Sequence, residues 1–167
     1  MKEYLLLLPI IFIFHDMEEI IGFCWFFRKN PKVFKKYPRL TSAYRNFTNE
    51  GFAIAVYEEF IPFFGISLLT YYFPSKVLYA IWFGLLLALT GHFVLHMIIC
   101  VYVKKFIPSL ITSIICLPIS LLILVKTAEF ITFDIMTTSL IIVTIPAMLI
   151  NGKIAHKMMK FGIWMNK

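Results

Sequence analysis

The stretch Phe14-His15-Asp16-Met17-Glu18-Glu19 interrupts the first hydrophobic run of the chain, where nearly every neighbouring residue is Leu, Ile or Phe. A charged side chain near the centre of a bilayer costs roughly 2.5–3.5 kcal/mol on insertion scales, so such residues mark functional sites by default. Positions i, i+3 and i+4 of a helix share one face, and His15, Glu18 and Glu19 have that spacing. All three are therefore expected to point into a helical bundle, with Asp16 at the edge of their face as a hydrogen-bond partner.

The composition of the whole chain is that of a membrane protein. Of its 167 residues, 60% are hydrophobic and 15% are charged, and the mean hydropathy is +0.85. These values exclude an ordinary soluble globular domain. The formal net charge of +7 is no sign of nucleic-acid binding, because the basic residues lie in loops between apolar runs, where they set membrane topology. The three cysteines lack CxxC spacing and are expected to pack as small apolar side chains.

Five apolar runs are each candidates to cross a bilayer as a helix, which takes about 20 residues. They predict an all-α, polytopic transmembrane helical bundle that forms a single domain over residues 1–167. The first run is expected to remain as a helix, because no small-x-small cleavage motif of a signal peptide follows it. The expected spans are residues 4–27, 51–73, 77–102, 107–125 and 135–150, of which the last is short and has an extension toward Ile154 as its alternative.

The basic residues are distributed unevenly between the loops. Thirteen of the sixteen lie in the long first loop, in the Lys104-Lys105 turn and in the tail, which five spans place on one side of the membrane. Lys2, Lys76 and Lys126 lie on the other side. The positive-inside rule then predicts that the N-terminus is outside and the C-terminus cytoplasmic. The expected location is a bacterial cell membrane, with the lipid bilayer as partner and no nucleic acid, and the oligomeric state stays open.

Two later spans carry matching polar insertions. Glu58 and Glu59 are adjacent in the second span, and His92 and His96 share one face of the third. At 1.5 Å per residue, Glu19, Glu58 and the two histidines lie roughly 9–15 Å in from the cytoplasmic ends of their spans. Imidazole and carboxylate groups bind divalent zinc, and His/Glu sets in helical bundles also hold iron or manganese. We therefore expect a buried metal site, with zinc as the first choice and iron or manganese as alternatives. Its predicted ligands are His15, Glu18, Glu19, His92 and His96.

The pattern His15-x-x-Glu18-Glu19 in the first span, followed by His92-x-x-x-His96, resembles the HXXEE domain family. The resemblance covers most of the chain. It implies an integral membrane protein of uncharacterised function whose motifs are those of a metal-dependent enzyme. The family also has an Asn-x-x-x-Glu element. Residues Asn46 to Glu50 have this spacing but lie at a loop edge, whereas Glu58 or Glu59 is better placed by depth, so both assignments stay open.

Three functions are compatible with such a site. The first, which we favour, is a metal-dependent hydrolase acting on a lipid, lipid-linked or membrane-peptide substrate from the cytoplasmic leaflet, with Glu58 or Glu59 as catalytic base. The second is a di-iron-type oxidase or hydroxylase, although the spans offer few histidines for that chemistry. The third is a non-enzymatic protein in which His and Glu form a proton relay or hold helices together. The HExxH motif of zinc proteases is absent, since Phe93 follows His92.

Other polar residues are expected to stay outside the chemistry. Thr90 and Thr112 lie within apolar runs, and core packing is the expected role for both, with hydrogen bonding to the site as the alternative. His156 stands among the lysines of the tail and is expected in solvent or at the membrane interface.

Overall fold

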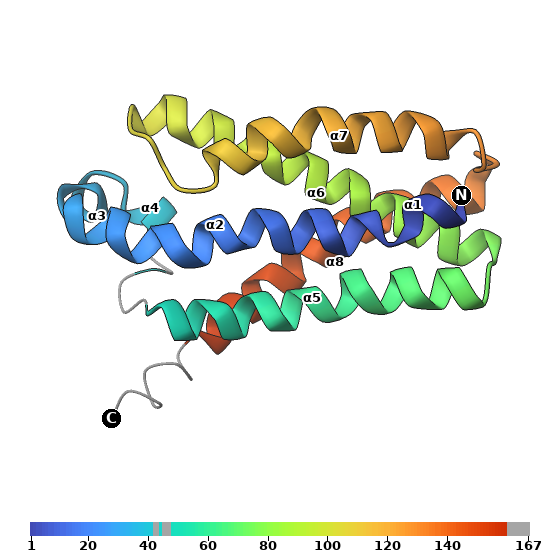
Figure 1. The fold of residues 1–167 in the computed structure, drawn as a ribbon, viewed down its shortest axis with the longest axis horizontal. Coiled ribbons are helices and arrows are strands. Elements are labelled where there is room, and N and C mark those ends of the chain that lie inside the picture. The colour runs from blue at the N-terminus through green and yellow to red at the C-terminus, as the bar shows by residue number, and fades with distance from the viewer. Residues whose placement is uncertain (42–43, 45–47, 160–167) are drawn as a thin grey trace.

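The computed structural model describes residues 1–41, 44 and 48–159, and the regular elements within these ranges are all helices (Figure 1). The long helices alternate in direction along the chain, so that each lies beside its neighbours in the bundle. This arrangement confirms the predicted all-α bundle. The five long helices of the described ranges are α2 (Leu7–Lys29), α5 (Asn49–Tyr72), α6 (Lys76–Val103), α7 (Leu110–Ala128) and α8 (Ile135–Met158).

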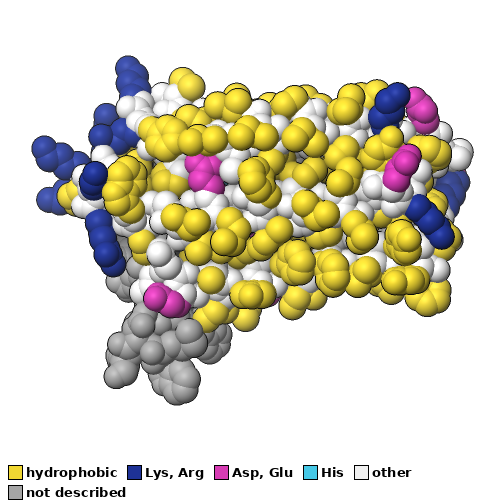
Figure 2. Space-filling model, viewed as in Figure 1, with side chains coloured by type: hydrophobic (Ala, Val, Ile, Leu, Met, Phe, Trp, Pro, Cys, Tyr) yellow, Lys and Arg dark blue, Asp and Glu magenta, His cyan; other side chains and the backbone are white. Residues whose placement is uncertain are grey.

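The surface of the bundle is that of an integral membrane protein. Four of the described helices, α5, α6, α7 and α8, are long and apolar enough to cross a membrane. Helix α2 has 23 residues, the length of a span, but it contains the acidic HDMEE segment. Figure 2 shows hydrophobic side chains over the flank of the bundle and Lys and Arg at its two ends. More of the basic residues gather at the end where α2 stops and α5 begins, and we call this the basic end.

Helix α6 lies at the centre of the bundle and contacts α5, α7 and α8, while α2 packs against α5 and α7. The buried side chains of α6 include Trp82, Leu86 and Phe93. A Cβ atom added at Gly84 would lie 2.8 Å from Cβ of Thr144, so α6 and α8 approach closely at this point. Because lipid is as apolar as the protein core, close packing of this kind drives helix association in membranes.

A short break at Leu6 separates α1 (Lys2–Leu5) from α2. Pro9 accounts for it, since proline has no N–H to donate to the carbonyl four residues earlier, which is that of Leu5. The indole N–H of Trp82 donates to this carbonyl at 3.0 Å, and both Leu5 and Trp82 are fully buried. Because an unpaired carbonyl is costly in an apolar interior, this hydrogen bond ties the start of the chain to α6.

Two short helices, α3 (Lys32–Lys36) and α4 (Pro38–Thr41), follow α2 in the long basic loop. Pro31 is the N-cap of α3 and Pro38 is the first residue of α4, positions at which proline is tolerated and limits the preceding helix. The Asn46 of the possible Asn-x-x-x-Glu element lies outside the described residues. Glu50 lies in the first turn of α5 and is exposed.

Helix α8 differs most from the predicted spans. The hydrophobic run ends near residue 150, but the helix continues to Met158, because a helix can extend past the apolar region when its polar residues find partners. At its other end, Asp134 accepts the backbone N–H of Thr137 at 2.8 Å and pairs with Lys76 of α6. The Lys76 ammonium and the Thr137 N–H hold the pKa of the Asp134 carboxyl below its ordinary value.

Candidate metal centre

The polar insertions of α2 and α6 meet inside the bundle. His15 and Glu19 of α2 face His92 and His96 of α6, and one ligand atom from each lies within 4.8 Å of the others. We call these four residues the His/Glu cluster. His15 is fully buried, and Glu19 is 4% exposed. A tetrahedral zinc ion separates its nitrogen and oxygen ligands by about 3.3 Å, so the cluster could hold a metal ion with small side-chain shifts.

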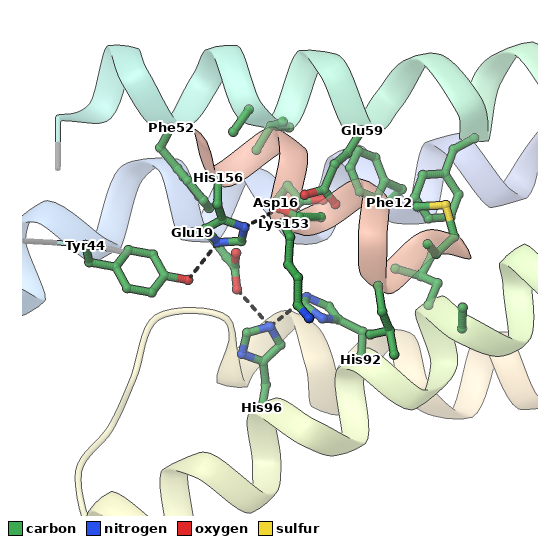
Figure 3. Close-up of a pocket in the computed structure, with 18 residues that line it drawn as sticks. Phe12, Asp16, Glu19, Tyr44, Phe52, Glu59, His92, His96, Lys153 and His156 are labelled. Carbon is green, nitrogen blue, oxygen red and sulfur yellow. Dashed lines mark hydrogen bonds and ion pairs between the residues drawn. The ribbon is translucent and has the colours of Figure 1, made fainter. Parts of the chain in front are cut away.

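Glu19 lies in the middle of the His/Glu cluster. Its Oε1 is 2.9 Å from Nε2 of His96 and 3.8 Å from Nε2 of His15. The Nε2 atoms of His96 and His92 are 2.7 Å apart, and Figure 3 shows Glu19, His96 and His92 in this sequence. Imidazole nitrogens and a carboxylate oxygen therefore converge, which is a donor set suited to zinc, iron or manganese.

Hydrogen bonds on the far side of His15 determine which of its nitrogens faces the cluster. Nδ1 is 2.9 Å from Oγ1 of Thr112, and the Thr112 hydroxyl donates to Oε2 of Glu18 at 2.6 Å. A hydroxyl has one proton, so Nδ1 of His15 carries its own hydrogen and donates it to Thr112. Nε2 keeps a free lone pair and, within the described chain, has no hydrogen-bond partner. A metal-binding histidine is commonly held in this way.

His96 is held by the same turn of α7. Its Nδ1 is 2.9 Å from Oγ of Ser109, which is fully buried and is the N-cap residue of α7. Ser109 makes no side-chain cap hydrogen bond to its own helix, because its hydroxyl faces His96. The start of α7 thus orients two imidazole rings that belong to two other helices.

Glu18, a predicted ligand, is placed against α7 and not in the His/Glu cluster. Its Oε2 accepts the backbone N–H of Thr112 at 2.8 Å in addition to the hydroxyl. Thr112 is in the first turn of α7, where backbone N–H groups have no partner within the helix and the helix dipole favours a negative charge. Glu18 therefore caps α7 from outside and supports the hydrogen bond that fixes His15.

The adjacent glutamates of α5 have different surroundings. Oε2 of Glu58 accepts a hydrogen bond from the amide of Asn151 on α8 at 3.1 Å. Glu59 lines a cavity next to the His/Glu cluster, as Figure 3 shows. Asp16 lines the same cavity, is 6% exposed, and interacts electrostatically with Glu19 and Glu59. Among the described residues, Oδ2 of Asp16 has no hydrogen-bond partner.

The residues that orient the cluster differ from those expected from the sequence. Thr112, expected mainly to pack in the core, is the hydrogen-bond partner of His15, and Ser109, for which the sequence predicts no role, contacts His96. His156, expected in solvent or at the interface, is half-buried and lines the cavity. The available signal for Thr112 and Ser109 was their position, since both are hydroxyl residues at the start of a span close to the depth of His96.

Comparison with known proteins identifies a family. The model of a family described as "Protein of unknown function with HXXEE motif" matches residues 6–123, which is more than half of the chain. The matched region contains the His/Glu cluster, Glu59 and the first turn of α7, and it ends before α8 begins. Neither a curated protein nor a solved structure matches the chain.

Proposed function

The chain belongs to the family of proteins of unknown function with an HXXEE motif, and we propose that it is a membrane-embedded, metal-dependent hydrolase. The observation that carries this proposal is the free Nε2 of buried His15, which faces Glu19 while its proton is held on the opposite nitrogen. A histidine that only joined helices would have both ring nitrogens hydrogen-bonded, because buried polar atoms are almost always paired. The proposed ligands are His15, Glu19, His92 and His96.

Zinc is the ion we propose first, since imidazole and carboxylate are its usual ligands in catalytic sites, with iron and manganese as alternatives. When bound, a divalent ion supplies Lewis acidity toward water and toward a carbonyl or phosphoryl oxygen. The cavity borders Glu19, His92 and His96, so water and substrate reach the cluster from that side. His15 is closed off on the opposite side by α7.

Glu59 is the proposed catalytic base. The hydrogen bond of Glu58 to Asn151 directs that carboxylate toward α8, which leaves Glu59 as the α5 carboxylate that lines the cavity. Glu59 takes a proton from water as the water oxygen bonds to the carbonyl carbon or phosphorus. It returns this proton to the leaving oxygen or nitrogen as the scissile bond breaks.

We also propose the orientation of the protein in the membrane. The basic end (Figure 2) is placed in the cytoplasm by the positive-inside rule, which puts the N-terminus outside. Glu19 lies ten residues before the end of α2, about 15 Å along the helix. The cavity therefore lies in the cytoplasmic half of the bundle, and the substrate enters from the inner leaflet.

One observation favours a second candidate function. Asp16, Glu19 and Glu59 line one cavity beside the histidines, and carboxylate-rich sets in helical bundles hold pairs of iron ions. A di-iron-type oxidase or hydroxylase would use these additional carboxylates as ligands. Two iron ions per chain and a visible absorbance would support this candidate against a zinc hydrolase.

The proposal is tested by measuring metal per chain on detergent-purified protein, using wild type, His15→Ala and His92→Ala. We expect near-stoichiometric metal in wild type and its loss in both variants. His156→Ala is the matched control, because His156 lies outside the His/Glu cluster, and it should keep its metal. Folded wild type that holds no metal after loading and dialysis at neutral pH would refute the proposed centre.

A further inference from the structure

The cavity beside the His/Glu cluster contains groups that the proposed hydrolytic chemistry does not use. It has a volume of about 250 Å³ and lies between α2, α5, α6 and α8. Each of the four helices contributes an acidic residue or a histidine to it, whereas most of the remaining lining is apolar. Figure 3 shows a lysine and a histidine from α8 at the same cavity. These α8 residues lie outside the region matched by the family model.

The lining changes character along the length of the cavity. Helix α8 contributes a single face, which begins with Met148 and Leu149 and ends with Lys153 and His156. Glu59 of α5 lies level with Gly152, because a Cβ added at Gly152 would be 3.6 Å from its Oε1. Reactive groups therefore occupy the middle of the cavity, and the deep side is apolar. Toward the basic end the lining combines Lys153 and His156 with the apolar side chains of the first turns of α5.

The deep side of the cavity is aromatic. The rings of Phe12 and Phe63 stack with their centroids 4.5 Å apart, and both line the cavity. From Met148 to His156 the cavity extends about 12 Å along α8. This length and the apolar residues at its deep end suit an extended hydrocarbon chain.

Lys153 supplies the positive charge at the opposite side. The residue is exposed and lines the cavity, and its side chain extends from α8 toward His92 in Figure 3, so its ammonium group lies between the rim of the cavity and the His/Glu cluster. Within residues 1–41, 44 and 48–159, no carboxylate forms an ion pair with its ammonium group. Asp16 and Glu19 are buried, so Lys153 is the exposed charged residue of the described lining.

His156 and Tyr44 also line the cavity. Nδ1 of His156 lies 2.6 Å from the carbonyl oxygen of Gly152 and must donate to it. The hydroxyl of Tyr44 lies 3.4 Å from Nε2 of His156, where it donates to that nitrogen. His156 therefore has both ring nitrogens engaged by groups of the protein, which leaves Lys153 as the cation proposed to recognise the ligand.

We propose that the cavity binds an amphiphile with an apolar chain and an anionic head group. Its chain lies between Phe12 and Phe63, its anionic group pairs with Lys153, and the bond to be cleaved lies between them, beside Glu59. Cleavage of this ligand rests on the proposed hydrolase function, whereas its binding does not. The proposal requires the head group to sit at the basic end of the bundle, where the head groups of the bilayer also lie.

The test measures binding of dodecyl phosphate to the detergent-purified full chain by native mass spectrometry. Lys153→Met should weaken binding roughly tenfold, as expected when one charge-assisted hydrogen bond is lost. Lys157→Met is the matched control, because Lys157 is exposed on the next turn of α8 and does not line the cavity. It should bind like wild type, and both variants should keep the wild-type metal content.

Two further ligands separate the parts of the proposal. Dodecyltrimethylammonium that binds as tightly as dodecyl phosphate would overturn the anionic head group. Inorganic phosphate that displaces dodecyl phosphate at equal concentration would show that the apolar chain contributes nothing to binding, which would overturn the amphiphile proposal.

The two proposals fail in distinguishable ways. Metal-bearing protein whose dodecyl phosphate affinity does not depend on Lys153 would overturn the binding proposal alone. Protein that lacks metal but binds in a Lys153-dependent manner would overturn the metal centre and support the binding proposal.

Discussion

Replacing Thr112 by valine tests whether α7 fixes the metal-binding form of His15. The substitution keeps the shape of the side chain but removes the hydroxyl that accepts from Nδ1 of His15 and donates to Glu18. The backbone N–H of residue 112 still reaches Glu18, so the cap of α7 is retained. The change therefore acts mainly on the orientation and tautomer of one imidazole ring.

The expected loss is 10–100-fold in metal affinity, the usual effect of removing a hydrogen-bond partner of a ligating histidine. This corresponds to about 1.4–2.8 kcal/mol. The assay is competition for metal with a chromophoric chelator at fixed pH in detergent. Thr112→Ser keeps a hydroxyl and should restore most of the affinity.

Thr127→Val is the matched control for this experiment. Thr127 is also buried on α7, but its hydroxyl bonds to the carbonyl of Ile123 on its own helix at 2.7 Å. Its replacement should leave metal affinity unchanged. A Thr112→Val protein that binds metal within about twofold of wild type would show that the hydroxyl does not set the state of His15, and the reasoning from its free Nε2 would fail.

Three further predictions concern stability. Trp82→Phe should lower the free energy of unfolding by about 1–3 kcal/mol, because it leaves the buried carbonyl of Leu5 without its donor; reversible unfolding in mixed micelles measures this. Gly84→Val should lower the free energy of unfolding by about 1–3 kcal/mol, because the added side chain overpacks the contact of α6 with α8. An unchanged melting temperature would contradict the close approach of these helices. The carboxyl pKa of Asp134 is depressed by Lys76 in the folded protein, so its stabilising contribution is present at neutral pH and declines as the pH falls below the ordinary carboxyl pKa. Melting curves of wild type and Asp134→Asn should therefore converge toward acid pH, and a constant difference down to pH values well below the ordinary carboxyl range would contradict this origin.

The fold and the core of the cluster could be predicted from spacing and depth. Apolar runs of span length predict the helices, and the i, i+4 pairs His15 with Glu19 and His92 with His96 place two ligands on one face of each helix. Alternating spans then bring these faces to one depth. The structure brings the same four side chains together, because ionisable groups in a bilayer are driven toward one another and away from lipid.

The hydrogen-bond partner of Glu18 could not be predicted from spacing and depth. Spacing places it on the same side of α2 as His15 and Glu19, but that side faces both α6 and α7. The partner of Glu18 depends on which of these two helices lies closer to it. The first turn of α7 has backbone N–H groups without a partner in the helix, and the Glu18 carboxylate accepts one of them. The basic end of the cavity was missed for a related reason, since hydropathy ends the fifth span before Lys153, while the helix continues.

Helix α7 stabilises the site inside the membrane through hydrogen bonds to two other helices. Its N-terminus needs hydrogen-bond acceptors, and Glu18 supplies one from α2. The docking of α7 in turn places Thr112 and Ser109 against His15 and His96. Each of these groups thus supplies a hydrogen-bond partner to a polar atom that would otherwise be unpaired in a medium without water. The same contacts that hold α7 in the bundle therefore also orient the rings of His15 and His96 in the His/Glu cluster, so that assembly of the fold and preparation of the site depend on the same hydrogen bonds.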